Sequence, residues 1–226
     1  MTVQYNTDDK EVILPCACDR EYYVEELGEV ETKLLYAFFK RAFDILFSLV
    51  CMVLLALPMV LIALWIKCTT QGTVFYRQER LGLMGKKFNI IKFRMMRMDA
   101  EQDAICWSMG EDDPRITPVG HFLRQTRLDE LPQLWCILKG DMSVVGPRPE
   151  REVYYHRFEQ YIHGFSERLK VKPGLTGLAQ VRGGYYLMPQ DKVVYDVEYI
   201  KTRSVWLDIK IVFTTIAVVF KREGAK

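Results

Sequence analysis

The apolar run at residues 42–66 constrains this chain more than any other feature. It is 25 residues long, and about 20 apolar residues carry a helix across a bilayer. Pro58 interrupts the run about two-thirds of the way along, where its ring and missing N–H kink or break a helix. Lys40 and Arg41 precede the run and Lys67 follows it. A spanning helix normally concentrates such charges on its cytoplasmic side.

Three structures are compatible with this pattern. The run can span the membrane, enter and leave by one face with a turn at Pro58, or form a buried core helix. The similar charge at both ends favours the re-entrant form, but the pattern leaves all three open. Asp44 lies three residues after Arg41 and four after Lys40. We expect it to pair with one of them on the helix surface, at headgroup depth, because an ionised Asp in hydrocarbon is costly.

The C-terminal segment at 204–222 is a second candidate for membrane contact. It is largely apolar, with Trp206 near its start and Lys221 and Arg222 at its end. A Trp anchor, an apolar face and a basic end are typical of interfacial helices. An amphipathic helix docked on the core explains the segment equally well, and its β-branched residues leave a strand open.

Charge is distributed unevenly along the chain. Residues 1–31 hold nine acidic and two basic side chains, a net charge of −7, whereas residues 77–97 hold seven basic and one acidic side chain, a net charge of +6. The basic band predicts an anionic partner: phosphate groups, lipid headgroups or nucleic acid. None of the six cysteines forms a C-x-x-C pair or lies at metal-ligand spacing from a histidine. We expect reduced thiols, which suits a cytosolic location.

The middle of the chain predicts an α+β domain that is mostly helical. Short apolar and basic stretches alternate between 73 and 98, and Gly82 and Gly85 offer a turn. This pattern predicts a β-hairpin whose second strand is 88–93. The remaining sheet is expected to be small. The predicted helices cover 99–107, 121–128, 129–138, 150–161, 190–203 and the C-terminal segment.

The adjacent acids Asp129 and Glu130 are the best candidates for chemistry. If a helix begins here, Asp129 is a good N-cap, Glu130 favours the positive end of the dipole, and Pro132 is tolerated in the first turn. Alternatively, two carboxylates can hold a divalent cation while one of them attacks an electrophile. An Asp that attacks phosphorus gives an acyl phosphate, which can pass its phosphoryl group onward. The pair alone leaves both interpretations open.

Several basic residues indicate a phosphate-rich ligand. Arg148 stands between two prolines in "VGPRPE", and a guanidinium held rigidly in this way suits bidentate phosphate binding. A rigid turn with an exposed Arg is the alternative. Lys92 and Arg94 in "IKFR", Arg115 in "DDPRIT" and Lys172 in "KPGLTG" add further positive charge. No G-x-G-x-x-G or P-loop motif is present, so nucleotide binding of those kinds is not indicated.

Taken in order, several stretches resemble one family closely: "FKRAFDILFSL", "LPMVLIALWIK", "VFYRQERLG", "FNIIKFRMM", "DPRITPVGHFLRQTRLDELPQLWCILKGDMSVVGPRPE" and "KPGLTGLAQV". They resemble the bacterial sugar transferases, the monotopic phosphoglycosyl transferases that start glycan assembly on polyprenol phosphate. The resemblance covers about residues 36–220. It implies a re-entrant membrane hairpin broken at Pro58, on the cytoplasmic face of the bacterial inner membrane. Small members often carry Ser before that proline, where this chain has Leu57.

The resemblance also implies a ping-pong reaction. The family's nucleophile matches Asp129, which would attack the β-phosphorus of a UDP-sugar and expel UMP. Glu130 matches the acid thought to help place Mg²⁺, so both acids are the predicted metal ligands. Undecaprenyl phosphate or a similar polyprenol phosphate would then accept the sugar phosphate. Arg148 would contact the phosphates or the uridine of the donor, and Lys92, Arg94 and Arg115 fall on family positions without individual roles.

The expected organisation follows from these arguments. An acidic leader occupies 1–35, the membrane hairpin 36–68, the catalytic domain 69–203 and the interfacial helix 204–222. Larger members carry a multi-span N-terminal half, so this chain is either a minimal form or a cut-down larger one. Glucose, galactose and N-acetylgalactosamine phosphates all remain open, as does a homodimer. An inactive membrane scaffold and a metal-dependent lipid diphosphate phosphohydrolase are the alternatives, and nucleic-acid binding would leave the apolar run unexplained.

Overall fold

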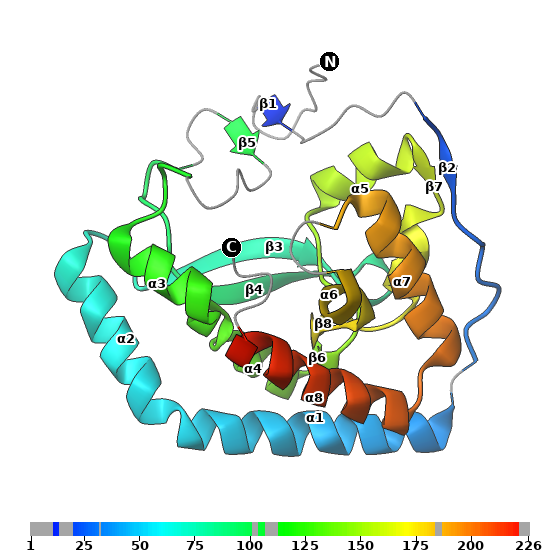
Figure 1. The fold of residues 1–226 in the computed structure, drawn as a ribbon, viewed down its shortest axis with the longest axis horizontal. Coiled ribbons are helices and arrows are strands. Elements are labelled where there is room, and N and C mark those ends of the chain that lie inside the picture. Colours follow the sequence, from blue (N-terminus) through cyan, green and yellow to red (C-terminus); the bar gives the residue numbers. More distant parts are fainter. Residues whose placement is uncertain are drawn as a thin grey trace.

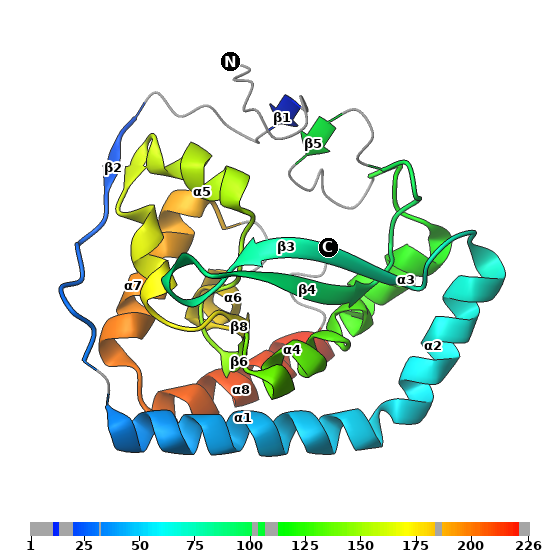
Figure 2. The ribbon, with the colours of Figure 1, turned by 180° about the vertical axis from the view of Figure 1, so that it is seen from behind.

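The structure is a computed structural model that describes residues 11–13, 20–31, 33–100, 104–106, 113–183 and 187–221. Two helices joined at an elbow, α1 and α2, run along the edge of the molecule (Figure 1). A long β-hairpin crosses the middle of the molecule, and shorter helices lie between it and α1 (Figures 1 and 2). The architecture is α+β and mostly helical with several two-stranded sheets, as predicted.

The apolar run forms α1 (Leu34–Leu54) and α2 (Ala56–Thr69), which meet at an angle of 62°. Within the described residues, length and hydropathy fit a membrane span for the bent pair together and for no one helix alone. The break lies at Leu55, three residues before Pro58, at which the break was expected. The reason is that a proline clashes with the carbonyl four residues earlier, here that of Leu54, and disrupts the turn that precedes it.

Much of the surface of α1 and α2 is apolar and exposed. An exposed apolar patch of this extent marks a membrane or protein contact in ordinary proteins. The exposed large apolar side chains on the two helices are Leu34, Leu35, Phe38, Phe39, Phe43, Ile45, Leu46, Leu49, Val50, Val53, Leu54, Leu57, Val60, Leu61, Leu64 and Trp65.

The predicted hairpin is confirmed. Strands β3 (Phe75–Leu81) and β4 (Lys87–Phe93) pair antiparallel across the short turn η1 (Leu83–Gly85). Met84 and Gly85 both have positive φ, at 53° and 75°. The glycine accommodates this left-handed backbone without a steric penalty. On β4, Phe88 and Ile90 are buried, in keeping with the two-residue period of a strand.

The other strands form short parallel pairs. They join β6 (Ser143–Val145) to β8 (Gly174–Thr176), β2 (Tyr22–Tyr23) to β7 (Ile162–His163), and β1 (Glu11–Ile13) to β5 (Ala104–Cys106). The predicted helix at 99–107 is therefore wrong at 104–106, while 101–103 and 107 lie outside the described residues. Its partner strand is more than 90 residues away in the chain, so the local pattern carried no sign of it.

The predicted helices are otherwise confirmed, with shifted ends. They are α3 (Pro118–Thr126), α4 (Gln133–Lys139), α5 (Glu152–Glu159), α7 (Pro189–Thr202) and α8 (Val205–Lys221). Helix α6 (Leu178–Gly183) was not predicted. Two 3₁₀ segments, η2 (Leu128–Glu130) and η3 (Phe165–Lys170), complete them. Helix α8 settles the choice between helix and strand at the C-terminus.

Part of the acidic leader lies against the body of the protein. Residues 20–31 run past η3 and α7, where Glu25 pairs with Lys201 and the Glu31 carbonyl accepts a bond from Arg203 (2.6 Å). Leader residues 1–10 and 14–19 lie outside the described part of the chain. Among the cysteines that the structure describes, Cys51, Cys68 and Cys136 are free thiols, as expected.

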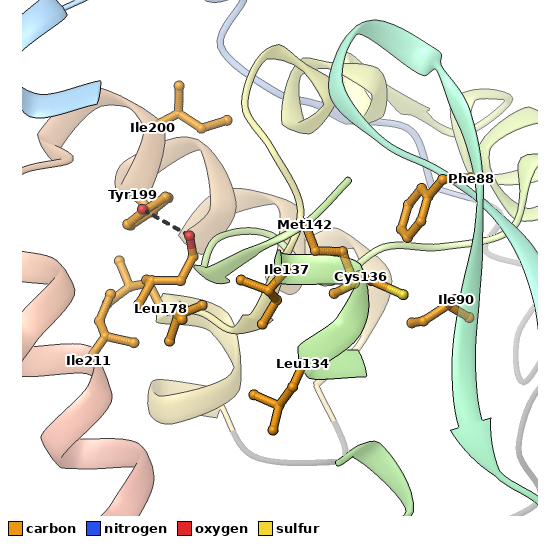
Figure 3. Packing of buried hydrophobic residues seen from close by; sticks show 12 residues of the cluster. Phe88, Ile90, Leu134, Cys136, Ile137, Met142, Leu178, Tyr199, Ile200 and Ile211 are labelled. Carbon is orange, nitrogen blue, oxygen red and sulfur yellow. Dashed lines mark hydrogen bonds between the residues drawn. The ribbon is translucent and has the colours of Figure 1, made fainter. Parts of the chain in front are cut away.

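The central core joins the hairpin to α4, α7 and α8. Figure 3 shows Phe88 and Ile90 on one side, Leu134 and Ile137 of α4 in the middle, and Ile211 of α8 on the other side. Each such side chain stabilises the fold by about 1.5–3 kcal/mol when fully buried. Because α4 begins three residues after Glu130, this core also holds the acid pair in place.

Candidate active site

The acid pair lies in η2, between α3 and α4. Arg127, just before it, has a left-handed backbone with φ of 56°, so the chain changes direction there. Asp129 makes no capping hydrogen bond, and α4 starts only at Gln133 with Pro132 as its N-cap residue. The structural explanation of Asp129 as an N-cap is therefore wrong. Its carboxyl is 4% exposed and lines a cavity instead.

Glu130 is held by two cations. Arg148 Nη2 lies 2.5 Å from Glu130 Oε1 and Arg148 Nη1 lies 3.4 Å from Oε2, so the guanidinium spans the carboxylate. Lys92 Nζ donates to Glu130 Oε1 at 2.9 Å and lies 3.7 Å from Asp129 Oδ2. Lys92 thus bridges the two acids. Three residues predicted from separate stretches of sequence, Lys92, Glu130 and Arg148, meet at one point.

The two carboxyls have opposite pKa shifts. Burial raises the pKa of Asp129 to about 6, with Lys92 opposing and the charge of Glu130 adding to the shift. Burial acts in the same direction on Glu130, but Arg148 and Lys92 outweigh it and hold the pKa of Glu130 below its usual range. Glu130 therefore stays ionised while Asp129 titrates near neutral pH. Neighbouring acids whose environments separate their pKa values in this way are a common feature of catalytic sites.

The cavity above the pair has a volume of about 530 Å³, which suits a small-molecule ligand. Its walls come from the hairpin, α3, the loop around Arg148 and α7. Among the described residues, Glu150 is the one other acid in its lining besides Asp129 and Glu130. Cations dominate, so the cavity is suited to a polyanion. They are Arg77, Arg80, Lys92, Arg94, Arg97, Arg115, Arg124, Arg127, Arg148, Arg151 and Lys192.

Arg94 and Arg115 line this cavity, but their hydrogen bonds are structural. Arg94 donates to Thr70 Oγ1 at 2.6 Å and to Met98 Sδ at 3.0 Å, which ties the end of α2 to the end of β4. Arg115 contacts Asp113 through Nε at 2.8 Å and Nη2 at 2.6 Å. Both residues add positive potential to the cavity wall.

Lys172 is not brought to the acid pair. It lines a separate cavity of about 190 Å³ together with Lys86, Gly140 and Asp141. Burial lowers the pKa of Lys172, and the nearby charge of Arg41 lowers it further. The glycine-rich turn that suggested a ligand contact here serves to join β8 to β6 instead.

Asp44 does not pair with Lys40 or Arg41 on the helix surface, so that expectation is wrong. It is 3% exposed and accepts hydrogen bonds from Ser143 Oγ at 3.0 Å and from the backbone N–H of Val144 at 2.9 Å. One edge of β6 pairs with β8. The Val144 N–H on β6 is not used in that pairing, and the Asp44 carboxylate on α1 accepts it. A buried acceptor for a buried N–H outweighs an exposed i,i+4 ion pair.

Arg41 and Lys40 also turn toward the protein. Arg41 donates to the carbonyls of Ile137 and Leu138, both at 2.7 Å, in the last turn of α4. A cation is favourable there because the last carbonyls of a helix are unpaired and carry partial negative charge. Since α4 follows the acid pair, this contact links α1 to the site.

Lys40 is the centre of a polar cluster between α1, α7 and α8. Its ammonium lies 2.9 Å from Asp208 Oδ2, 2.9 Å from the Val145 carbonyl and 3.2 Å from the Tyr199 hydroxyl. Tyr36 also donates to Asp208, at 2.9 Å. Figure 3 marks the related bond from Tyr199 to the Val145 carbonyl. Val145 leads directly into the loop that carries Arg148.

Sequence reasoning missed one part of the site. Glu150 is 6% exposed and lies between Arg80 Nη1 at 3.1 Å and Lys192 Nζ at 3.2 Å. Its position in "GPRPE" next to Arg148 was a signal for Glu150. Arg80 belongs to the basic band at 77–97, but Arg80 and Lys192 lie 70 and 42 residues from Glu150, and nothing in the sequence linked either cation to it.

With the geometry of the site established, similarity to known proteins can be assessed. A family profile described as "Bacterial sugar transferase" matches residues 35–222. The chain belongs to the bacterial sugar transferase family. The match includes α2, α1 from its second residue onward, and every residue assigned to the candidate site.

Individual members of the bacterial sugar transferase family are also similar to this chain. The UDP-glucose:undecaprenyl-phosphate glucose-1-phosphate transferase of Escherichia coli K12 is 42% identical over 191 residues, 82% of this chain and 41% of that protein. An Aeromonas hydrophila UDP-N-acetylgalactosamine-undecaprenyl-phosphate N-acetylgalactosaminephosphotransferase is 39% identical, over 89% of this chain and 48% of its own length. The undecaprenyl-phosphate galactose phosphotransferase of Salmonella typhimurium is 41% identical, over 83% and 42%. The chain spans less than half the length of these relatives.

The Mg²⁺ that the resemblance to bacterial sugar transferases implies fits this site in part. Among the described residues, no group of three or more His, Cys, Asp or Glu side chains could hold a metal ion. Mg²⁺ is commonly bound by one or two carboxylates together with substrate phosphates and water. Asp129 is suited to this role, because its nearest cation is 3.7 Å away. Glu130 is less suited, because both of its oxygens already contact Arg148 or Lys92.

Proposed function

We propose that this chain is a phosphoglycosyl transferase that moves a sugar-1-phosphate from a UDP-sugar to a polyprenol phosphate through a covalent intermediate on Asp129. The observation that carries the proposal is that the two adjacent acids differ in their contacts and in their pKa values. Glu130 is clamped by Arg148 and Lys92, whereas Asp129 faces a cation-lined cavity with a pKa of about 6. The names of the three relatives support the donor and acceptor classes.

In the first step, a carboxylate oxygen of Asp129 attacks the β-phosphorus of the donor. The bond from that phosphorus to the oxygen that bridges the two phosphates breaks, and UMP leaves with the electron pair. The product is a sugar-phosphoryl ester of Asp129, an acyl phosphate. Near neutral pH enough Asp129 is ionised to attack, while the cations around it neutralise the diphosphate, which is the main requirement of phosphoryl transfer.

In the second step, a phosphate oxygen of the polyprenol phosphate attacks the same phosphorus. The Asp129–phosphorus ester bond breaks, and the carboxylate returns to its starting state. The product is a polyprenyl diphosphate that carries the sugar. Neither step requires a proton transfer by the protein, which is consistent with a site that has cations and carboxylates but no His among its lining residues.

Bound Mg²⁺ would neutralise the charge of the donor diphosphate. In this chain Asp129 would contribute one ligand and the phosphate oxygens of the donor would contribute others. Lys92 and Arg148 hold Glu130 and orient it toward the same side of the cavity. Their charges favour the diphosphate in the same way and would keep it close to Asp129.

We also propose that α1 and α2 enter the cytoplasmic leaflet of the inner membrane and leave by the same face. The supporting observation is that both outer ends of the pair are tied to one domain. Lys40, near the start of α1, binds Asp208, and Thr70, at the end of α2, binds Arg94. Helix α8 adds exposed Trp206 and Phe213, as an interfacial helix would.

The covalent step can be tested directly by intact-protein mass spectrometry. The protein is incubated with Mg²⁺ and either UDP-glucose, UDP-galactose or UDP-N-acetylgalactosamine, without lipid. We expect a sugar-phosphate adduct with at least one donor in the wild type, and none in the Asp129→Asn variant. An adduct that persists in Asp129→Asn would remove Asp129 from the mechanism.

A second assay separates transfer from hydrolysis and from scaffolding. UMP release is measured with and without polyprenol phosphate. Multiple turnover that requires the lipid supports the transferase. Release of inorganic phosphate from a lipid diphosphate would support the phosphohydrolase, and a chain without either activity would support the scaffold.

A further inference from the structure

The loop that carries Arg148 is held through its backbone carbonyls. Its two prolines have no N–H, so the loop cannot be held by a regular strand ladder. Its carbonyls bind donors from several elements instead. The Pro147 carbonyl accepts from Gly174 N at 2.9 Å, that of Arg148 from Arg168 Nη2 at 3.0 Å, and that of Pro149 from Arg80 Nη1 at 3.2 Å.

Arg168 is the most deeply buried of these side-chain donors. It lies in η3, it is 1% exposed, and its Nη2 is 2.6 Å from Asp196 Oδ2 on α7. Its guanidinium also lies 4.9 Å from the centre of the Phe165 ring. In the described part of the chain, its Nε and Nη1 have no hydrogen-bond partner. Burial of an ion pair of this kind seldom adds net stability.

The backbone group that Arg168 binds is the carbonyl of Arg148. Pro149 already restricts the backbone of Arg148 to extended conformations. The added bond fixes the Arg148 peptide through its carbonyl, and Arg168 is not itself among the residues that line the cavity. It thereby fixes the point from which the Arg148 side chain reaches Glu130.

We infer that Arg168, held in place by Asp196, is a positioning residue that sets Arg148 against Glu130 and the donor phosphates. The inference rests on the proposed function, because it concerns how the residues of the same site are held in position. Without Arg168 the Arg148 peptide can rotate, so its guanidinium would contact Glu130 and the donor for only part of the time. The alternative is that Arg168 and Asp196 form a core ion pair with no effect on Arg148.

The decisive variant is Arg168→Lys in a double-mutant cycle with Arg148→Lys. Arg168 Nη2 makes both contacts, to Asp196 and to the Arg148 carbonyl. The substituted lysine would keep the positive charge beside Asp196, but its ammonium ends nearer the backbone than Nη2 and on a flexible stem, so it cannot hold both partners at these distances. We expect Arg168→Lys to lower kcat/KM per folded enzyme about tenfold, and less than about twofold when Arg148 is already replaced by lysine. Equal losses in both backgrounds, or no loss in the first, would overturn the inference. Melting temperatures separate this effect from a loss of folded protein.

A second variant tests the other half of the pair. Asp196→Asn should lower kcat/KM and weaken UDP binding as Arg168→Lys does, because it releases the Arg168 guanidinium that binds the Arg148 carbonyl. The matched control is Glu198→Gln, two residues along α7, which removes an exposed pair with Arg182 at 2.7 Å. Unchanged kcat/KM and UDP affinity in Asp196→Asn would count against the inference. If this variant does not fold, the double-mutant cycle still decides.

The outcomes for the two proposals are distinguishable. A wild type that forms no adduct and releases no UMP would refute the proposed function. An active wild type whose Arg168→Lys variant has unchanged kcat/KM would refute the positioning role alone. UDP affinity, measured by calorimetry across the four proteins of the cycle, gives a readout that does not depend on turnover. We expect Arg168→Lys to raise the Kd for UDP about tenfold on its own, and less than about twofold in the Arg148→Lys background.

Discussion

Arg148 spans the carboxylate of Glu130, with guanidinium nitrogens 2.5 and 3.4 Å from its two oxygens. A carboxylate held in this way is stabilised as an anion and is a poor nucleophile. Its neighbour Asp129 lacks such a clamp and carries the raised pKa. This difference supports the proposal that Glu130 organises the cations and that Asp129 is the acid that reacts.

The rate of adduct formation should depend on the ionisation of Asp129. Because its pKa in the folded protein is about 6, we expect the single-turnover rate to fall about tenfold per pH unit well below pH 6 and to level off above it. Rapid-quench measurements of UMP release between pH 4.5 and 8 would test this. A rate that is flat down to pH 4.5 would contradict the assigned pKa shift.

Asp129→Asn should also reveal the cost of burying the charge. The folded pKa of Asp129 is raised, so its contribution to stability is fully present below its unfolded pKa near 4 and is lost as the pH rises through 6. A neutral Asn avoids this loss. We expect Asp129→Asn to melt higher than the wild type at pH 8, with a smaller difference at pH 5. Calorimetry at both pH values is the measurement, and a variant that melts lower at pH 8 would contradict it.

Glu130→Gln should slow the reaction without abolishing it. The amide keeps the shape of the side chain but loses the charge that holds Arg148 and Lys92. We expect kcat/KM to fall by about 10²–10³, in the range seen when one electrostatic group is removed from an active site. The adduct on Asp129 should still be detectable by mass. Loss comparable to that of Asp129→Asn would instead make Glu130 the reacting acid.

Asp44→Ala should destabilise the fold by about 2 kcal/mol, because it leaves a buried backbone N–H and a buried hydroxyl without their acceptor. The control is Glu79→Ala on the hairpin, which removes an exposed pair with Lys87 and should change stability by less than about 0.5 kcal/mol. Urea unfolding in detergent would measure both. Equal effects would mean that the Asp44 contacts with β6 contribute no more than an ordinary surface pair.

Pro58→Ala should leave both outer ends of the α1–α2 pair on the cytoplasmic side. The bend is at Leu55, and the ends of the pair are held by the Lys40–Asp208 and Thr70–Arg94 contacts. The natural Cys68 near the end of α2 is exposed and gives a convenient probe. A membrane-impermeant maleimide applied from the periplasmic side should not label it in either protein. Periplasmic labelling in the variant alone would mean that the proline, and not the anchors, sets the turn.

The parts of the fold predicted correctly are those with a local signature. The strand at 87–93 alternates exposed and buried residues over 87–90, and Gly82 and Gly85 mark its turn. The gathering of Lys92, Asp129, Glu130 and Arg148 was expected from the resemblance, because "IKFR", "LDELP" and "GPRPE" are short and rich in chemistry. Spacing alone would not have brought them together.

The parts predicted wrongly depend on partners far away in the chain. Asp44 was assigned to its helix neighbours, yet it binds Val144, 100 residues away. Nothing near Lys172 shows that its turn is occupied in joining β8 to β6. The 3₁₀ turn at 128–130 replaced a helix start because α4 begins only after Pro132. Tertiary contacts decided the first two cases against a plausible local pattern, whereas the third follows from the local position of Pro132.

The inward face of α1 limits how this protein can be engineered. Lys40, Arg41 and Asp44 supply hydrogen bonds to the interior of the domain, to α4, β6 and α8. Deleting α1 and α2 to obtain a water-soluble enzyme would therefore remove part of the scaffold beneath the acid pair. A soluble version would have to keep these three side chains on α1 and place polar residues only at the exposed apolar positions of the two helices.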